Sequence, residues 1–188
     1  MEDVDADYVR DIRNLILDEG NFPMAKISEL ANDFRDAFQS GHKVAFVGNG
    51  GSAAEAMHIA AEFTGKCVID HSPWPVMCLN ESQSSITAIG NDYGFDHIFE
   101  RQVLAHLRKG DILICLSTSG KSPNIRLAIA AAQSIGCQIY LWTGAGHESE
   151  DVNYQVWKVN SLQTPRIQEI HLMWGHILSQ IVEKIVEE

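Results

Sequence analysis

The fold is decided by residues 43–63, KVAFVGNGGSAAEAMHIAAEF. This stretch begins with a short apolar run, passes through a glycine-rich turn and continues with the composition of a helix. Three further apolar runs are each bounded by Gly, Pro, Ser or Asp and separated by helical stretches: PVMCLN at 75–80, DILICLS at 111–117 and CQIYLW at 137–142. Alternation of this kind predicts a mostly parallel sheet with helices on both faces.

The flanking segments complete a single domain over residues 1–188, because a chain of this length has no room for a second one. YQVWKV at 154–159 alternates apolar and polar residues, which predicts a fifth strand at the edge of the sheet. Two helices are expected at about 5–40, with a break at Gly20 to Pro23, and a last helix at about 165–187. The α/β core then covers about 43–160. The expected architecture is a three-layer α/β/α sandwich with extra helices at both ends.

Charge and composition restrict the partners. The formal net charge of −11 repels nucleic acid and anionic membrane surfaces. The start, MEDVDADYVRDIR, lacks the apolar core of a signal peptide, and no run approaches the roughly 18 apolar residues of a membrane span. We therefore expect a cytoplasmic protein with neither nucleic-acid nor membrane partners. Its four separated cysteines are expected to be mostly buried, reduced thiols: Cys67, Cys78, Cys115 and Cys137.

The first candidate ligand loop is GNGGS at 48–52, directly after one strand and before a helix. Ligands of open parallel sheets bind beyond the carboxyl ends of the strands, and the free N–H groups of a helix start favour an anion. The loop also passes as GxGxxA through Gly48, Gly50 and Ala53, but the acidic ribose ligand of a dinucleotide site is missing from the end of the next strand. A purely structural tight turn is the remaining alternative.

The second candidate loop is STSGKS at 117–122, before a helix that starts near Pro123. Four hydroxyls and Gly120 suit a phosphate monoester, because hydroxyls and backbone N–H groups both donate hydrogen bonds. The loop is not a Walker A motif, since Cys115 stands where that motif needs glycine. Capping of the following helix alone is the alternative.

Two groups of titratable residues lie on predicted helices. His58 and Glu62 are four residues apart and share a helix face. Such a pair can bind a metal, act as a base with its partner, or be a surface pair. RIQEIHLMWGH at 166–176 adds Gln168, His171 and His176 to the last helix. Histidines on an apolar helix are more often packed than catalytic.

Four segments in order resemble the SIS (sugar isomerase) superfamily and, within it, the phosphoheptose isomerases: GNGGSAAEAMHIAAEFTGK, AIGNDYGFDHIF, LSTSGKSPNI and RIQEIHLMWGH. The resemblance covers about residues 30 to 186. It implies a flavodoxin-like SIS fold and an aldose-ketose isomerase that converts sedoheptulose 7-phosphate to D-glycero-D-manno-heptose 7-phosphate through an enediol(ate). The alternative is a non-enzymatic SIS protein, either a sugar-phosphate sensor or a scaffold that binds the replication initiator. The initiator-binding relative lacks the Glu and the last His present here as Glu62 and His176.

The resemblance also implies roles for individual residues. Glu62 is expected to be the general base and His176 the partner acid. One Zn²⁺ per site is expected on His58, Glu62, Gln168 and His176, whereas His171 belongs to the motif without being a ligand. The residues expected to contact the sugar phosphate are Asn49, Gly50, Gly51, Ser52, Glu62, Asn91, Asp92, Ser117, Thr118, Ser119, Ser122 and Gln168.

Three departures from the family pattern bear on which sugar the site accepts: Pro165 stands where many members have Asp, Lys66 where they have Arg, and AGHESED at 145–151 replaces a glycine-rich segment. The spacing in the last helix bears on assembly. Gln168 and His176 are separated by about 12 Å along a straight helix, too far to share one ion easily. We therefore expect a homotetramer, as in the family, with sites between subunits and at least one of the four metal residues donated by a neighbour.

Overall fold

The computed structural model describes residues 2–148 and 153–186. Its centre is one sheet of five parallel strands in the order β2-β1-β3-β4-β5. The strands are β1 (Val44–Gly48), β2 (Val76–Cys78), β3 (Ile112–Leu116), β4 (Gln138–Gly144) and β5 (Gln155–Val159). The predicted edge strand is confirmed as β5, and the sheet is entirely parallel.

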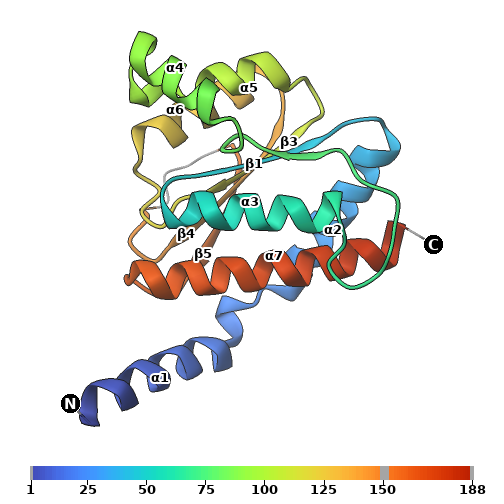
Figure 1. Cartoon of the computed structure of the whole chain (residues 1–188). Helices are drawn as coiled ribbons and strands as arrows, with labels where there is room; N and C mark the ends of the chain where they lie inside the picture. The colour runs from blue at the N-terminus through green and yellow to red at the C-terminus, as the bar shows by residue number, and fades with distance from the viewer. Residues whose placement is uncertain (1, 149–152, 187–188) are drawn as a thin grey trace.

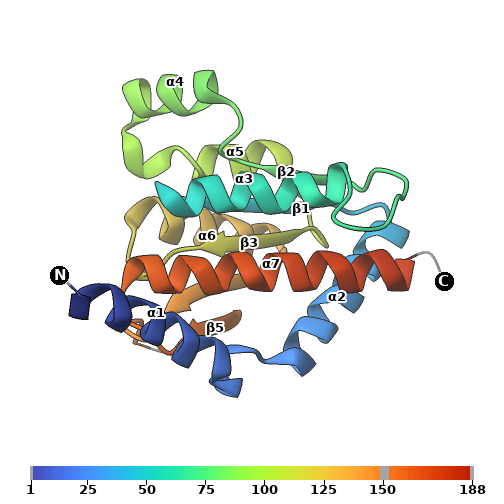
Figure 2. The same cartoon turned by 60° about the horizontal axis from the view of Figure 1, so that its bottom comes forward.

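Helices cover both faces of the sheet, which confirms the three-layer sandwich (Figure 1). One face carries α2 (Met24–Gln39), α3 (Gly51–Thr64) and α7 (Thr164–Val186). The other carries α5 (Glu100–His106) and α6 (Pro123–Ile135), with α4 (Gln83–Tyr93) at its margin. Figure 2 shows α3 and α7 running side by side, while α4 and the N-terminal α1 (Glu2–Leu17) project from the body. Short 3-10 turns at Glu19–Asn21 and Phe95–His97 complete the element order.

The central strands are continuous apolar runs because both of their faces are buried. In β1, Val44 and Phe46 point into the core beneath α2, α3 and α7, whereas Ala45 and Val47 point into the core beneath α5 and α6. All five residues of β1 and of β3 are buried. Only three-layer packing hides both faces of such strands.

Three tryptophans from β4, β5 and α7 form one aromatic cluster on the α7 side of the sheet. The rings of Trp142 and Trp157 stack with centroids 5.7 Å apart, and Trp174 meets them edge-on at 5.6 and 5.8 Å. The Trp174 indole N–H donates to the backbone carbonyl of Asn21 at 2.6 Å. These contacts dock α7 onto the sheet and onto the turn before α2.

Two expectations from the sequence concerned the cysteines and membrane-spanning helices. All four cysteines are free; Cys78 and Cys115 are buried, but Cys67 and Cys137 are partly exposed, so the expectation of burial was wrong for that pair. No helix within the described residues has the length and apolarity needed to span a membrane.

The sheet order places both candidate loops together. β1 and β3 are neighbours, and the strand order reverses between them, since β2 lies beyond β1 and β4 beyond β3. Loops that leave the carboxyl ends of such a strand pair open a crevice in which ligands bind. Residues 48–52 and 117–122 are these two loops.

Candidate active site

A cavity of about 190 Å³ lies between the two loops and the start of α7. Its lining residues are Asn49, Gly51, Ser52, Leu116, Ser117, Thr118, Ser119, Ser122, Thr164 and Gln168. A second cavity, of about 180 Å³, adjoins it and shares Thr118, Ser119 and Thr164 with it, while Lys121 supplies a cation. Most residues expected to contact the sugar phosphate are therefore gathered in one hollow.

The first loop is shaped by close backbone packing. A Cβ at Gly48 would collide with the backbone carbonyl group of Ser52, and Gly50 has φ +55, so both positions require glycine. The side chain of Asn80 holds the end of β1 from the neighbouring strand: its Oδ1 accepts from Gly48 N at 3.1 Å and its Nδ2 donates to Gly48 O at 2.9 Å. These two hydrogen bonds fix the turn that leads into α3.

The two loops are joined by a pair of amides. Asn49 and the buried Asn124 exchange two side-chain hydrogen bonds of 2.9 Å each. Sequence reasoning missed both Asn80 and Asn124; only their positions, at a strand end and beside Pro123, pointed toward this edge. The hydrogen bonds of these two amides hold the sides of the crevice together in the protein itself.

The second loop is folded by hydrogen bonds between its own backbone and hydroxyl groups. Gly120 N donates to Ser117 Oγ at 3.2 Å and Lys121 N donates to Ser119 Oγ at 3.1 Å, which folds the loop into a tight turn. Gly120 has φ +64, and the imidazole of His147 packs against it. Ser122 is the N-cap residue of α6, yet its hydroxyl makes no capping hydrogen bond, so capping does not account for it.

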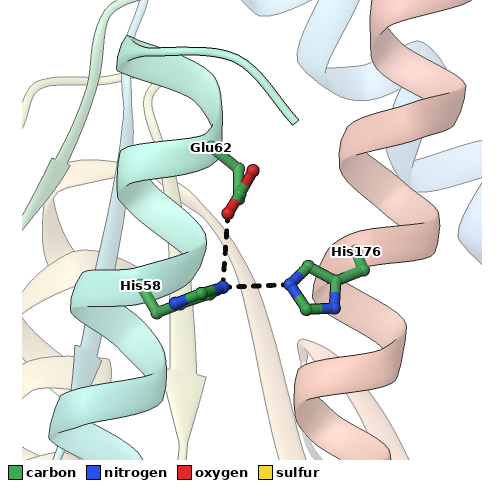
Figure 3. Close-up of side chains that lie close together, drawn as sticks. All are labelled: His58, Glu62 and His176. Carbon is green, nitrogen blue, oxygen red and sulfur yellow. Dashed lines mark hydrogen bonds and ion pairs between the residues drawn. The ribbon is translucent and has the colours of Figure 1, made fainter. Parts of the chain in front are cut away.

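A carboxylate and two imidazoles converge in the groove between α3 and α7 (Figure 3). His58 Nε2 lies 3.0 Å from His176 Nε2 and 3.2 Å from Glu62 Oε1. All three ligand atoms lie within 4.8 Å of one another. His58 and Glu62 meet because four residues return a helix to the same face, and α7 brings His176 opposite them. The Glu62 side chain is 18% exposed and that of His58 is 50% exposed, so the cluster opens to solvent.

The donor set of this cluster fits a zinc ion. Zinc takes imidazole nitrogen and carboxylate oxygen at about 2 Å, which places tetrahedral ligand atoms about 3.3 Å apart. Two of the pairs observed here are 3.0 and 3.2 Å apart. Two imidazole Nε2 atoms that face each other also repel unless a proton or a cation lies between them. Three of the four predicted metal residues are thus suitably placed within one chain.

Gln168, the fourth residue predicted to bind the metal, contacts the first loop. Its Nε2 donates to Ser52 Oγ at 3.2 Å, and its amide packs so closely on Gly51 that a Cβ there would come within 2.5 Å of Nε2. This agrees with the separation expected along α7. Asn91 and Asp92 are exposed on α4, where Asn91 Nδ2 donates to Asp92 Oδ1 at 2.8 Å, and neither lines the cavity.

Two more ionisable residues near these sites, His171 and Glu55, have shifted pKa values. His171 is fully buried beside the carbonyl of Thr143, and burial lowers its pKa to about 3 despite that hydrogen bond, so it is neutral. Glu55, which sequence reasoning missed, lies one turn before His58. Burial raises the pKa of Glu55 to about 8, and the Ser52 hydroxyl offsets this only in part. Both residues are therefore uncharged at neutral pH.

Two of the three departures lie beside the crevice, whereas Lys66 lies at the far end of α3. Pro165 occupies the first turn of α7 and is exposed, as is Lys66 after the end of α3. Of the AGHESED segment, residues 145–148 are described and Gly146 lines the second cavity, whereas 149–151 lie outside the described residues. None of the three is a member of the His58, Glu62 and His176 cluster.

This fold and the position of its loops define the class of protein. A family model described as "SIS domain" matches residues 7–144. The chain is 48% identical to a phosphoheptose isomerase of Rhodospirillum rubrum over 84% of both proteins, and 44% identical to one of Clostridium acetobutylicum over 90% of this chain and 86% of that protein. The chain belongs to the phosphoheptose isomerase family.

Solved structures agree with this assignment. A phosphoheptose isomerase from Francisella tularensis superposes with a TM-score of 0.90 at 28% identity, covering 97% of both chains. One from Neisseria gonorrhoeae gives a TM-score of 0.88 at 31% identity, covering 98% of this chain and 99% of that one. The similarity therefore includes α1, α4 and α7 as well as the central sheet.

Proposed function

We propose that this chain isomerises sedoheptulose 7-phosphate to D-glycero-D-manno-heptose 7-phosphate. The observation that supports this most directly is the meeting of His58, Glu62 and His176 beside a hydroxyl-lined crevice. The names of the relatives point to the same reaction. A sugar-phosphate sensor or a scaffold would need the crevice or a surface, but neither would need a base paired with an acid.

Phosphate recognition falls to the second loop. Its hydroxyls and the N–H groups at the start of α6 donate to the phosphate oxygens, and the helix dipole adds to the attraction. Lys121 lines the adjoining cavity and is the cation that the loop itself supplies. Held at this end, the sugar extends along α3 toward Glu62. Binding energy at the phosphate is thus converted into orientation of the reacting carbons.

The reaction moves one proton between carbons and one between oxygens. The Glu62 carboxylate removes a proton from C1 of the ketose and returns it to C2, and His176 carries the hydroxyl proton from O1 to O2. Positioned proton transfer of this kind contributes about 10²- to 10⁴-fold in rate. Zn²⁺ bound by His58, Glu62 and His176 would supply positive charge for the enediolate oxygen. Gln168 and Ser52, which line the crevice, would contact the sugar hydroxyls.

Assembly as a cytoplasmic homotetramer is part of the same proposal. α4 has no buried residue, and it exposes Tyr93 together with Asn91 and Asp92. α1 exposes Val9 and Leu17. Exposed apolar side chains on projecting helices favour coverage by further copies of the chain. A copy seated on α4 would close Asn91 and Asp92 into a site between subunits.

The deciding experiment is turnover of sedoheptulose 7-phosphate by zinc-replete protein, with Glu62→Gln as the matched control. The substitution keeps size and removes the base, so we expect at least about a 100-fold lower kcat with an unchanged circular dichroism spectrum. Near-normal turnover by the variant would dismiss Glu62 as the base. Wild-type protein that is stabilised by the sugar phosphate without turning it over would favour the sensor.

A further inference from the structure

A buried carboxylate near the end of α7 binds the chain segment that follows α3. Glu183 is 1% exposed and accepts hydrogen bonds from three consecutive backbone N–H groups. Cys67 N and Val68 N donate to its Oε1 at 2.7 and 3.0 Å, and Val68 N and Ile69 N donate to its Oε2, both at 3.1 Å. Hydrogen bonds to an ionised acceptor are about twice as strong as neutral ones.

Aromatic packing shields this arrangement from water. The imidazole of His71 stacks on Trp74 with ring centroids 3.6 Å apart and planes 7° apart, and its side chain is 1% exposed. His71 Nε2 lies 3.7 Å from Glu183 Oε1, while Nδ1 donates to the carbonyl of Ser72 at 2.8 Å. Because water is excluded, the hydrogen bonds from these three N–H groups link α7 rigidly to residues 67–69.

Glu183 lies on the same face of α7 as His176 of the catalytic cluster. His176, Gln180 and Glu183 are spaced at i, i+4 and i+7, which places them in one row along α7. His58 and Glu62 of α3, followed by Cys67, lie opposite this row. The Cys67 thiol lies beside the Glu62 carboxylate and the Gln180 amide. A continuous row of polar side chains thus connects Glu183 to Glu62, the proposed base.

We propose that Glu183 is a positioning residue that sets the register of α7 against α3, and thereby the approach of His176 to His58 and Glu62. The apolar contacts between the two helices pack them together at their crossing. The three N–H groups that donate to Glu183 add directional bonds near the end of α7, and these bonds oppose sliding along the axis. Catalytic groups must be held to within about 0.5 Å, and one residue of sliding is about 1.5 Å. The inference rests on the proposed function for its catalytic consequence.

The test substitutes Glu183→Gln and measures zinc affinity by competition with a chromophoric chelator. Loss of a group that orients metal ligands typically weakens binding by about 10- to 100-fold, and we expect that range here. In steady-state kinetics kcat should fall while KM for sedoheptulose 7-phosphate stays near the wild-type value, because the phosphate loop lies at the other end of α3. If Glu183→Gln does not fold, Glu183→Asp keeps the charge, and we expect the same pattern at smaller size.

Asp111, which directly precedes β3, provides a matched control. Its carboxylate is fully buried and accepts from Lys43 N at 3.0 Å, from Arg108 N at 2.9 Å and from Lys43 Nζ at 2.8 Å. Asp111→Asn should therefore lower the thermal midpoint while zinc affinity and kcat stay at wild-type values. If Glu183→Gln behaves in the same way, Glu183 is only a stabilising residue and the proposal is overturned.

Failure of the proposed function gives a different result. Wild-type protein that binds zinc without isomerising the sugar would refute the function, and the ratio of zinc affinities between wild type and Glu183→Gln would still decide the role of Glu183. Wild-type protein that binds no zinc would overturn the positioning proposal, since no ion would then depend on the register of α7.

Discussion

Gly175→Ala tests how closely α3 and α7 must pack for catalysis. Gly175 is buried where α7 crosses Ile59, and an added Cβ would lie 2.5 Å from both Cδ1 and Cγ1 of that side chain and 3.2 Å from Cγ2. Carbon atoms in contact prefer about 3.5 to 4.0 Å, so about 1 Å of displacement is needed. Ile59 has no exposed surface and cannot move outward. Either its rotamer is strained or the helices separate.

The expected stability change follows from this overpacking. Extra methyl groups in a well-packed core typically cost about 1 to 3 kcal/mol. For a chain of this size, each kcal/mol lowers Tm by about 2 to 4 °C, so the variant should melt about 2 to 12 °C below wild type. Thermal unfolding followed by circular dichroism measures this directly.

The expected fall in kcat follows from the position of Gly175 next to the catalytic cluster. His176 directly follows Gly175, and its Nε2 lies 3.0 Å from that of His58. A displacement of about 1 Å in catalytic geometry can lower the rate by about 100-fold. Ile59→Ala removes the three atoms that lie nearest to the new methyl, so the double variant should recover kcat and be less destabilised than the two single losses added together. Unchanged Tm and kcat in Gly175→Ala would refute this account of the helix pair.

Three further results are expected. Replacing Ser119 and Ser122 with Ala should mainly raise KM, and sedoheptulose without its phosphate should be a very poor substrate; equal use of both sugars would reject the loop's role. Burial raises the pKa of Glu55 to about 8 from 4.5, so unfolding releases a proton between these values and stability should fall as pH rises through that window. Urea titrations at pH 5 and 8 should show Glu55→Gln with a smaller fall than wild type, and an identical fall would contradict the assignment. Ultracentrifugation should show a tetramer, and a monomer fully active at nanomolar concentration would argue against sites between subunits.

The sheet could be predicted because its strands are buried on both faces and therefore appear as unbroken apolar runs between turn residues. The pairing of His58 with Glu62 could also be predicted, because it depends only on helical spacing. Their meeting with His176 depends on how α3 crosses α7, and no local pattern specifies that crossing. The resemblance supplied His176, but it also grouped Gln168 with the same ion, whereas the structure places that amide beside Ser52.

Most of the residues that sequence reasoning missed have partners that are distant in the chain. Asn124 meets Asn49, Asn80 meets Gly48, and Glu183 meets backbone N–H groups that follow α3. In the sequence Glu183 belongs to a charged helix end, where a solvated surface carboxylate is the ordinary expectation. Glu183 is buried where α7 packs against the segment that follows α3.

The four tryptophans of this chain divide into two optical environments. Trp142, Trp157 and Trp174 form the cluster under α7, and His171 lies 5.3 Å from the Trp174 ring. Trp74 stands apart, stacked on His71 beside Glu183. Indole fluorescence and near-ultraviolet dichroism respond to changes in ring packing of this kind. The middle of α7 and the region around Glu183 near its C-terminal end thus each contain a natural chromophore, and Trp74→Phe protein would separate the two signals without any attached dye.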